Sequence, residues 1–373
     1  MLTEKLKNAG LFFLGIKRKE VYPDYRPTVT ILIPAYNEEM IIGQTILNMR
    51  QQTYPITEII VADDASSDWT GDIGRAMDTT VVRTPKNTGA KSRAQNYALD
   101  FVTTDVVVTV DADTSLDPKA IEYILPALAD GKTLSACGFV IPQVVETFWE
   151  KARLVEYLYG IGLFKKAQEH VSMPIVSSGC FSAFNVKLLN EIGRFPEGNI
   201  AEDMALTWKA HIAGYKIKFV PEAISFPKDP SNWPQFRGQV LRWYRGFFQC
   251  ISMVKGDFLK NLKLSAFIFF YLIMGMLAIV FLGLFAYFFV TGLIFNSALG
   301  ITSLSLALFF SIEIAIGITV VAINGKRCGC LKKAVMYYPY LWIISFVNSG
   351  LFFYALYEEW IRGKKLDVWE KGH

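Results

Sequence analysis

Three long runs of apolar residues close the chain, and they limit what it can fold into. Residues 264–295 and 334–357 contain no charged side chain, and residues 301–323 contain only Glu313. A run of about 18 or more apolar residues can cross the ~30 Å hydrocarbon core of a bilayer as a helix. The pattern therefore predicts about three transmembrane helices over residues 264–357 in a multi-pass protein of the cell membrane.

Positive residues near the apolar runs predict the orientation in the membrane. Four of them separate the second run from the third: Lys326, Arg327, Lys332 and Lys333. Residues 296–300, between the first two runs, carry no charge. Since Lys and Arg favour the cytosolic side, we expect the residues before the first run in the cytosol. Three simple spans would place the C-terminal tail, residues 358–373, outside, although its basic residues favour the cytosolic side. The sequence therefore leaves two possibilities for the last run: it crosses fully, or it is broken or re-entrant.

The overall charge restricts the partners of the chain. Its formal net charge is +4, from 38 Lys and Arg against 34 Asp and Glu, with no concentrated basic block. Nucleic acid is therefore not an expected partner, whereas membrane lipid is, because the inner leaflet is anionic. The basic N-terminal segment, residues 1–27, is too short in its apolar part to span. It either lies in the membrane interface or forms a poorly ordered tail.

Short apolar runs alternate with helical patterns in the first part of the chain. Strands are expected at residues 29–33, 58–62, 80–83 and 106–110, with helices at 39–50, 68–77 and 90–101. Apolar strands separated by helices are typical of a parallel sheet covered on both faces, so the predicted fold class is α/β, doubly wound. Further on, helices are expected at 146–167, 199–213 and 234–254, and a strand-like run at 176–185.

Polar residues follow three of the predicted strands. They are residues 34–38, the pair Asp63 and Asp64, and the pair Asp111 and Asp113. Ligands of doubly wound folds bind at the carboxyl ends of strands, so these groups are candidates for one site. Asp111 and Asp113 can meet one Mg²⁺ or Mn²⁺ together with diphosphate oxygens, although a polar turn explains them as well. Asp63 and Asp64 can accept hydrogen bonds from a nucleoside, or can complement a helix dipole.

A second acidic pair begins the helix predicted after Asn199. Glu202 is where a reciprocal capping contact with Asn199 would place it, so its role can be structural. Capping does not explain Asp203. A carboxylate there could take the proton of an acceptor hydroxyl as a general base.

The helix predicted at 234–254 carries a polar flank beside an apolar stripe. Gln239, Arg242 and Trp243 fall within about 100° of arc on a helix of 3.6 residues per turn. Arg242 could hold a diphosphate, and Trp243 could stack on a sugar ring. An amphipathic helix at the membrane surface explains the same residues, and both interpretations can hold together.

Taken in order, these segments resemble the membrane-embedded family-2 glycosyltransferases of the processive polysaccharide synthase kind. Residues 34–38 resemble the opening loop of that family. The later segments resemble its ordered D, D-x-D, (T)ED and Q-x-x-R-W series, and they are most similar to poly-N-acetylglucosamine synthases, with chitin and hyaluronan synthases near. The resemblance implies a GT-A domain with a mixed sheet at residues 28–232, interfacial helices at 233–263, and the transmembrane helices behind them.

The resemblance also implies an activity and residue roles. It implies inverting transfer from a UDP-sugar to a polysaccharide or a lipid-linked acceptor, with a Mg²⁺ or Mn²⁺ ion. The implied nucleotide-binding residues are Pro34, Ala35, Tyr36, Glu38, Asp63, Asp64, Lys91 and Asp111. Asp111 and Asp113 would hold the metal, and Asp203 would be the base. The diphosphate and acceptor site would comprise Ser178, Gly179, Cys180, Glu202, Gln239, Arg242 and Trp243.

This sequence departs from the family pattern in three ways. Ala201 replaces a common Thr, and Lys91 comes one residue later than the usual N-x-G-K. A pair of N-terminal spans is missing, so a sealed polymer channel would need a second copy or a partner subunit. Transfer of one sugar to a lipid or polyprenyl phosphate is therefore the alternative activity. A membrane scaffold or sugar-nucleotide-binding regulator without turnover is a third hypothesis.

Overall fold

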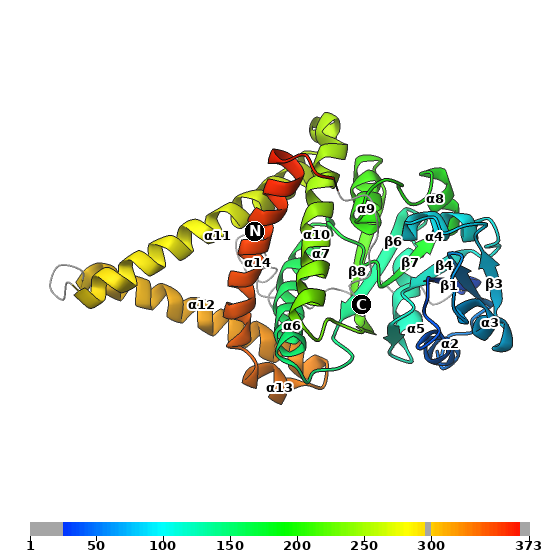
Figure 1. Ribbon diagram of the computed structural model, residues 1–373, viewed down its shortest axis with the longest axis horizontal. Coiled ribbons are helices and arrows are strands. Elements are labelled where there is room, and N and C mark those ends of the chain that lie inside the picture. Colours follow the sequence, from blue (N-terminus) through cyan, green and yellow to red (C-terminus); the bar gives the residue numbers. More distant parts are fainter. Residues whose placement is uncertain (1–24, 295–299, 366–373) are drawn as a thin grey trace, which may run out of the picture.

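The computed structural model describes residues 25–294 and 300–365 (Figure 1). The interfacial segment predicted for residues 1–27 lies almost wholly outside the described residues. The same holds for residues 366–373 of the predicted tail and for most of the uncharged connector at 296–300.

One eight-stranded sheet forms the centre of the N-terminal part, with the strand order β3-β2-β1-β4-β7-β6-β8-β5. Its first four strands pair in parallel: β1 (Val29–Ala35), β2 (Glu58–Asp63), β3 (Thr80–Arg83) and β4 (Val106–Val110). β3 and β4 have the limits predicted from sequence, whereas β1 and β2 extend two residues and one residue further. Their carboxyl ends meet at one edge, because Ala35 is in register with Asp63. This arrangement brings the predicted polar groups to the same end of the sheet.

The second half of the sheet makes it mixed. Its strands are β5 (Thr114–Leu116), β6 (Thr133–Val140), β7 (Phe181–Asn185) and β8 (Lys216–Pro227). β7 runs antiparallel to both β4 and β6, and β8 pairs in parallel with β6 and antiparallel with β5. A wholly parallel sheet, expected from the first strands alone, is therefore wrong, whereas the predicted mixed sheet is confirmed.

Helices cover both faces of this sheet. Odd-numbered residues of β1, such as Ile31 and Ile33, pack with α2 (Ile42–Arg50) and α5 (Ala120–Ile124). Leu32 points to the opposite face and packs with α4 (Lys91–Leu99), α8 (Val186–Glu191) and α9 (Glu202–Ile212). This alternation follows from the two-residue period of a strand and buries both faces. The remaining short elements of this part are α3 (Thr70–Ala76) and the 3₁₀ turn η1 (Leu125–Leu128).

The start of α9 differs from the sequence prediction. Ala201, not Asn199, is the residue at the helix N-cap, and no side chain caps the helix there. The Asn199 side chain instead accepts a hydrogen bond from the Ala201 backbone N–H at 2.8 Å. Glu202 and Asp203 therefore occupy the first turn of α9 without the predicted capping contact.

A group of helices lies beside the sheet domain (Figure 1). The first are α6 (Phe148–Tyr159), a π-helical segment η2 (Gly160–Lys165) and α7 (Lys166–His170). The 22-residue α10 (Trp233–Val254) begins at the Asn232 cap, whose side chain accepts from the Gln235 N–H. Trp208 of α9 and Phe248 of α10 pack with Phe352 of the last long helix. The described apolar core thus continues from the sheet domain into the C-terminal helices.

The C-terminal part is helical. After the 3₁₀ segment η3 (Lys255–Lys260) come α11 (Leu262–Ile294), α12 (Gly300–Arg327), α13 (Leu331–Met336), α14 (Tyr340–Leu356) and the π-helical η4 (Tyr357–Ile361). Figure 1 shows α11 and α12 extending away from the sheet domain. Within the described ranges, one stretch, Tyr340–Ile361, is long and apolar enough to cross a bilayer, and Leu262–Leu277 is a shorter apolar segment. The number of about three transmembrane helices stays a prediction.

Candidate active site

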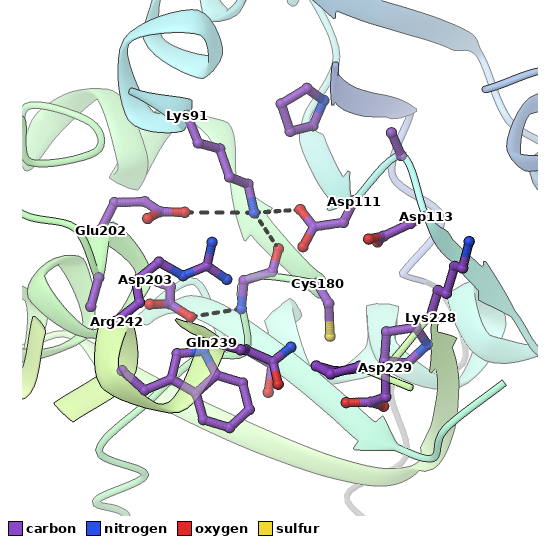
Figure 2. A pocket seen from close by; sticks show the side chains of 18 of the residues that line it. Lys91, Asp111, Asp113, Cys180, Glu202, Asp203, Lys228, Asp229, Gln239 and Arg242 are labelled. Atoms are coloured by element: carbon purple, nitrogen blue, oxygen red, sulfur yellow. Dashed lines mark hydrogen bonds and ion pairs between the residues drawn. The ribbon is translucent and has the colours of Figure 1, made fainter. Parts of the chain in front are cut away.

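A cavity of about 940 Å³ lies at the carboxyl ends of β1, β2 and β4. Figure 2 shows the side chains that face it, which come from the sheet domain and from α9 and α10. Of the seventeen site residues proposed from sequence, all but Asp63 line this cavity. They are Pro34, Ala35, Tyr36, Glu38, Asp64, Lys91, Asp111, Asp113, Ser178, Gly179, Cys180, Glu202, Asp203, Gln239, Arg242 and Trp243. Segments far apart in the sequence thus share one cavity.

The loop after β1 is held in place by its backbone. Asn37 has a positive φ of 55°, a conformation that Asn tolerates better than most residues. Its side-chain oxygen accepts from the Ser67 N–H at 2.8 Å, and the Glu38 N–H donates to the Thr70 hydroxyl at 2.7 Å. These contacts fix the turn and leave the Tyr36 ring partly exposed at the cavity.

Asp63 and Asp64 have different positions despite being neighbours. The Asp63 side chain is fully buried, pairs with Arg83 at 2.5 Å and accepts from the Ser66 N–H. It does not line the cavity, so its contacts are those of a structural residue. Asp64 faces the cavity and also accepts hydrogen bonds from Thr84 and Thr88, which places the loop before α4.

Asp111 and Asp113 both face the cavity where β4 ends. Burial raises the pKa of Asp113 to about 7, and the charge of Asp111 adds to the shift. In the part of the chain that the structure describes, no group of three or more His, Cys, Asp or Glu side chains could hold a metal alone. Two carboxylates whose charges repel still fit a divalent cation that takes its other ligands from a bound diphosphate and water.

Lys91 connects the two sides of the cavity. Its buried ammonium pairs with Asp111, lies 3.5 Å from Glu202 Oε1 and donates to the Gly179 carbonyl at 3.0 Å. Burial opposes its charge, but Asp111 and Glu202 outweigh burial and raise the pKa of Lys91. Burial also raises the pKa of Glu202, an effect that Lys91 partly offsets. The shifted position of this lysine in the sequence therefore does not remove it from the site.

Asp203 is oriented by two backbone groups. Its Oδ2 accepts from the Gly179 N–H at 2.8 Å, and its Oδ1 accepts from the Met204 N–H at 2.7 Å. A Cβ on Gly179 would lie 3.0 Å from Oδ2 of Asp203, so glycine permits this close approach. Next to Gly179, burial raises the pKa of the Cys180 thiol to about 12, so this cysteine is not an activated nucleophile.

The polar flank of α10 is positioned by a residue that the sequence did not single out. Arg153 of α6 is fully buried and donates to Gln239 at 2.7 Å and to Glu156 at 2.6 Å. Its guanidinium also lies 4.5 Å from the Trp243 ring centroid. Arg153 therefore fixes both Gln239 and Trp243 at the cavity wall.

Two further cavity residues were missed from the sequence. Lys165 donates to the Ser178 hydroxyl at 2.7 Å, and Asp229 lies in the loop after β8. Asp229 stands between Pro227 and Pro230, two residues after the end of a strand whose burial alternates. That pattern is the signal that could have identified Asp229, had β8 been recognised.

Comparisons with known proteins place this geometry in context. The family model for glycosyl transferase family 2 matches residues 30–193. The poly-beta-1,6-N-acetyl-D-glucosamine synthase of Staphylococcus aureus (strain COL) is 28% identical over 256 residues, 67% of this chain and 61% of the relative. The enzyme of the same description from Staphylococcus epidermidis is 28% identical over 245 residues, 64% of this chain and 59% of the relative. This chain thus spans about three fifths of the length of the curated relatives it matches.

A solved structure shares the fold over most of the chain. The mannosyltransferase PcManGT from Pyrobaculum calidifontis, in complex with GDP-Man and Mn²⁺, superimposes with a TM-score of 0.59 at 20% identity. The match covers 91% of this chain and 94% of that one. It therefore extends beyond the sheet domain into the C-terminal helices.

Proposed function

We propose that this member of glycosyltransferase family 2 transfers a sugar, with inversion, from a UDP-sugar to a growing polysaccharide at the cytosolic face of the cell membrane. The observation that carries the proposal is the shared cavity, which gathers sixteen of the seventeen residues suggested by sequence. Such an enzyme needs a donor site, a base and an acceptor site within one volume, and this cavity has candidates for each.

The donor would bind at the strand ends. Pro34, Ala35, Tyr36, Glu38 and Asp64 are proposed to hold the uridine. Asp111 and Asp113 would hold a Mg²⁺ or Mn²⁺ ion, which neutralises the charge of the departing diphosphate when it is bound. The cationic side chains of Lys91 and Arg242 face the same volume and would attract the diphosphate. Asp63 is left out of the proposed site because it lies outside the cavity.

The acceptor would approach from the side of α9 and α10. Asp203 is proposed to take the proton of the attacking hydroxyl, whose oxygen forms a bond to the anomeric carbon. The bond between that carbon and the diphosphate oxygen breaks, and the nucleoside diphosphate leaves on the opposite face. Ser178, Gly179, Cys180 and Glu202 would line the acceptor, with Trp243 stacking on its sugar ring.

The C-terminal helices are proposed to hold this site at the bilayer. At about 1.5 Å per residue, the 33-residue α11 and the 28-residue α12 are longer than the ~30 Å hydrocarbon core requires. Phe269 of α11 and Ile312 of α12 expose large apolar side chains. We therefore retain the proposed division into a GT-A domain (28–232), interfacial helices (233–263) and membrane helices (264–357). Export, and a second copy or partner subunit, are further parts of the proposal.

Product analysis tests this function. Purified protein in lipid nanodiscs would be incubated with radiolabelled UDP-N-acetylglucosamine, UDP-glucose or GDP-mannose and Mn²⁺. We expect a long labelled polymer from a UDP-sugar, with N-acetylglucosamine as the first choice. A product of one sugar on a lipid would replace polymer synthesis by the alternative activity, and release of no nucleotide from any donor would contradict both.

A further inference from the structure

The loop after β8 brings one more carboxylate to the cavity. The Lys228 backbone N–H donates to the Asp113 carbonyl at 3.1 Å, which holds the loop against the end of β4. Asp229, the next residue, lines the cavity together with Gln239 (Figure 2). Trp243 lines the same cavity. None of the roles derived above for donor, base or acceptor uses Asp229.

The two oxygens of Asp229 have unequal surroundings. Oδ1 accepts from the Tyr157 hydroxyl at 2.8 Å and lies 3.8 Å from Nε of Arg153. The side chain is only 1% exposed. Oδ2 is buried and has no hydrogen-bond partner among residues 25–294 and 300–365. An acceptor that is buried without a partner loses its hydration without compensation, so a ligand that donates to it would be favoured.

The surroundings of Asp229 also hold its position and its charge. Burial raises its pKa to about 6, while Arg153 and the Tyr157 hydrogen bond oppose the shift. Both contacts favour the ionised carboxylate, whose oxygens can only accept hydrogen bonds. Arg153 is fixed in turn by Glu156 and Gln239. Asp229 is thus a rigid acceptor inside a cavity proposed to hold sugars.

We propose that Oδ2 of Asp229 accepts a hydrogen bond from a sugar hydroxyl in the cavity and so selects sugars by the position of that hydroxyl. The inference rests on the proposed function, because it takes the ligand of the cavity to be a sugar. Both the sugar of the donor and the terminal sugar of the acceptor carry such hydroxyls. The experiment therefore has one arm for each source.

The donor arm compares Asp229→Asn with the unmodified protein by calorimetry in Mn²⁺. The probes are UDP and UDP-N-acetylglucosamine, with UDP-glucose and GDP-mannose used if either binds more tightly. A hydrogen bond to a charged group accounts for about 10- to 100-fold in affinity. We expect the nucleotide sugar to lose this factor and UDP alone to keep its affinity. The acceptor arm covers the case in which the hydroxyl belongs to the acceptor. In that case, the KM of Asp229→Asn for an N-acetylglucosamine oligosaccharide rises by the same factor, and the affinity for the donor is unchanged. No change in either arm overturns the inference.

Tyr157→Phe is the matched control, because it removes the hydrogen bond to Oδ1 and leaves Oδ2 in place. We expect a smaller loss than in Asp229→Asn. An equal loss would show that the loop position, and not Oδ2, is what matters, and would overturn the inference.

Deoxy analogues of the nucleotide sugar provide a test that does not depend on the variant folding. The unmodified protein should lose about 10- to 100-fold in affinity for one analogue of the donor, or in KM for one analogue of the acceptor. A uniform response to all analogues contradicts the inference.

The outcomes for the proposed function and for Asp229 can be told apart. A protein that binds the nucleotide sugar but never transfers it would refute the proposed function, whereas the binding measurements would still decide the role of Asp229.

Discussion

The two sides of the cavity are built in different ways. On the strand side, Asp64, Asp111 and the residues 34–38 follow parallel strands whose register brings their ends together. On the helix side, Asp203 is held by Gly179, and Gln239 is held by Arg153, which is 86 residues away in the sequence. The register of the sheet therefore positions the first group, whereas hydrogen bonds between distant segments position the second.

Two buried cations also support the cavity, and they differ in whether their own side chains line it. Lys91 itself lines the cavity and contacts Asp111, Glu202 and the Gly179 carbonyl, and it could exchange these contacts for a ligand. Arg153 is enclosed by α6, α10 and the loop after β8. We infer that the contacts of Lys91 change when ligands bind, whereas those of Arg153 persist.

The largest expected effect is on the helix side, at the proposed base. Asp203→Asn keeps the shape of the side chain but removes its capacity to take a proton. We expect kcat to fall by about 10²- to 10⁴-fold, the usual contribution of general acid–base catalysis, while calorimetry shows unchanged UDP binding. An active Asp203→Asn enzyme would refute the assignment of the base.

Arg153→Met tests whether a buried cation supports the helix side. The variant leaves the buried Asp229 without its compensating charge, and breaking a buried pair in this way costs about 3–5 kcal/mol. Denaturant unfolding in detergent measures the loss. The control is Arg93→Met, because Arg93 pairs with Glu197 on the surface, where such pairs contribute about 0–1 kcal/mol. Equal losses in the two variants would show that Arg153 has no special role.

Asp63 and Asp64 provide a sharper test on the strand side. Asp64→Asn should weaken UDP binding by about 10-fold, because a charged acceptor in the cavity is lost. Asp63→Asn should leave UDP binding unchanged and lower the free energy of unfolding by about 1–3 kcal/mol, since it weakens the contacts with Arg83 and Ser66. The reverse pattern in calorimetry and unfolding would mean that the two residues have been assigned the wrong roles.

The smallest expected effect concerns the contact between Gly179 and Asp203. In Gly179→Ala, the new Cβ would stand 3.0 Å from Oδ2 of Asp203, so the carboxylate must shift by a few tenths of an ångström. We expect kcat to fall by about 2- to 10-fold, because misplacement by a full 1 Å can cost about 10²-fold. The control is Gly160→Ala, where a Cβ would meet no atom within 4 Å. If steady-state kinetics give Gly160→Ala a lower kcat than Gly179→Ala, the proposed role of the contact between Gly179 and Asp203 is contradicted.

The difference between the two sides also explains what the sequence could predict. The limits of β3 and β4 agree with the predicted strands, because a buried parallel strand is a continuous apolar run that ends at a polar residue. β8 carries Lys216, Lys218 and Glu222, and these charged residues interrupt the apolar run by which the other strands were predicted. Because β8 was not predicted from the sequence, Asp229 in the loop after it was not predicted as a site residue either.

Local sequence was least informative about the buried charges. Arg153 stands in a helix with other charged residues and could equally belong to a solvated face. Its burial depends on Gln239 and Asp229, which come from other elements.

The start of α9 was also not predictable from local sequence. Asn199 has the residue type of a helix cap, yet α9 starts at Glu202 after Ala201. A Cβ on Gly246 of α10 would stand 2.5 Å from Cβ of Ala201, a close approach that no local pattern reveals.

Electron cryomicroscopy of the unmodified protein with UDP and Mg²⁺ tests the central claim most directly. The account predicts a cation about 2.1 Å from a carboxylate oxygen of Asp111 or Asp113, bound to the diphosphate, with the uracil beside Tyr36 and Asp64. A nucleotide bound on another surface, or a cation away from both aspartates, would contradict the proposal that this cavity is the site of sugar transfer.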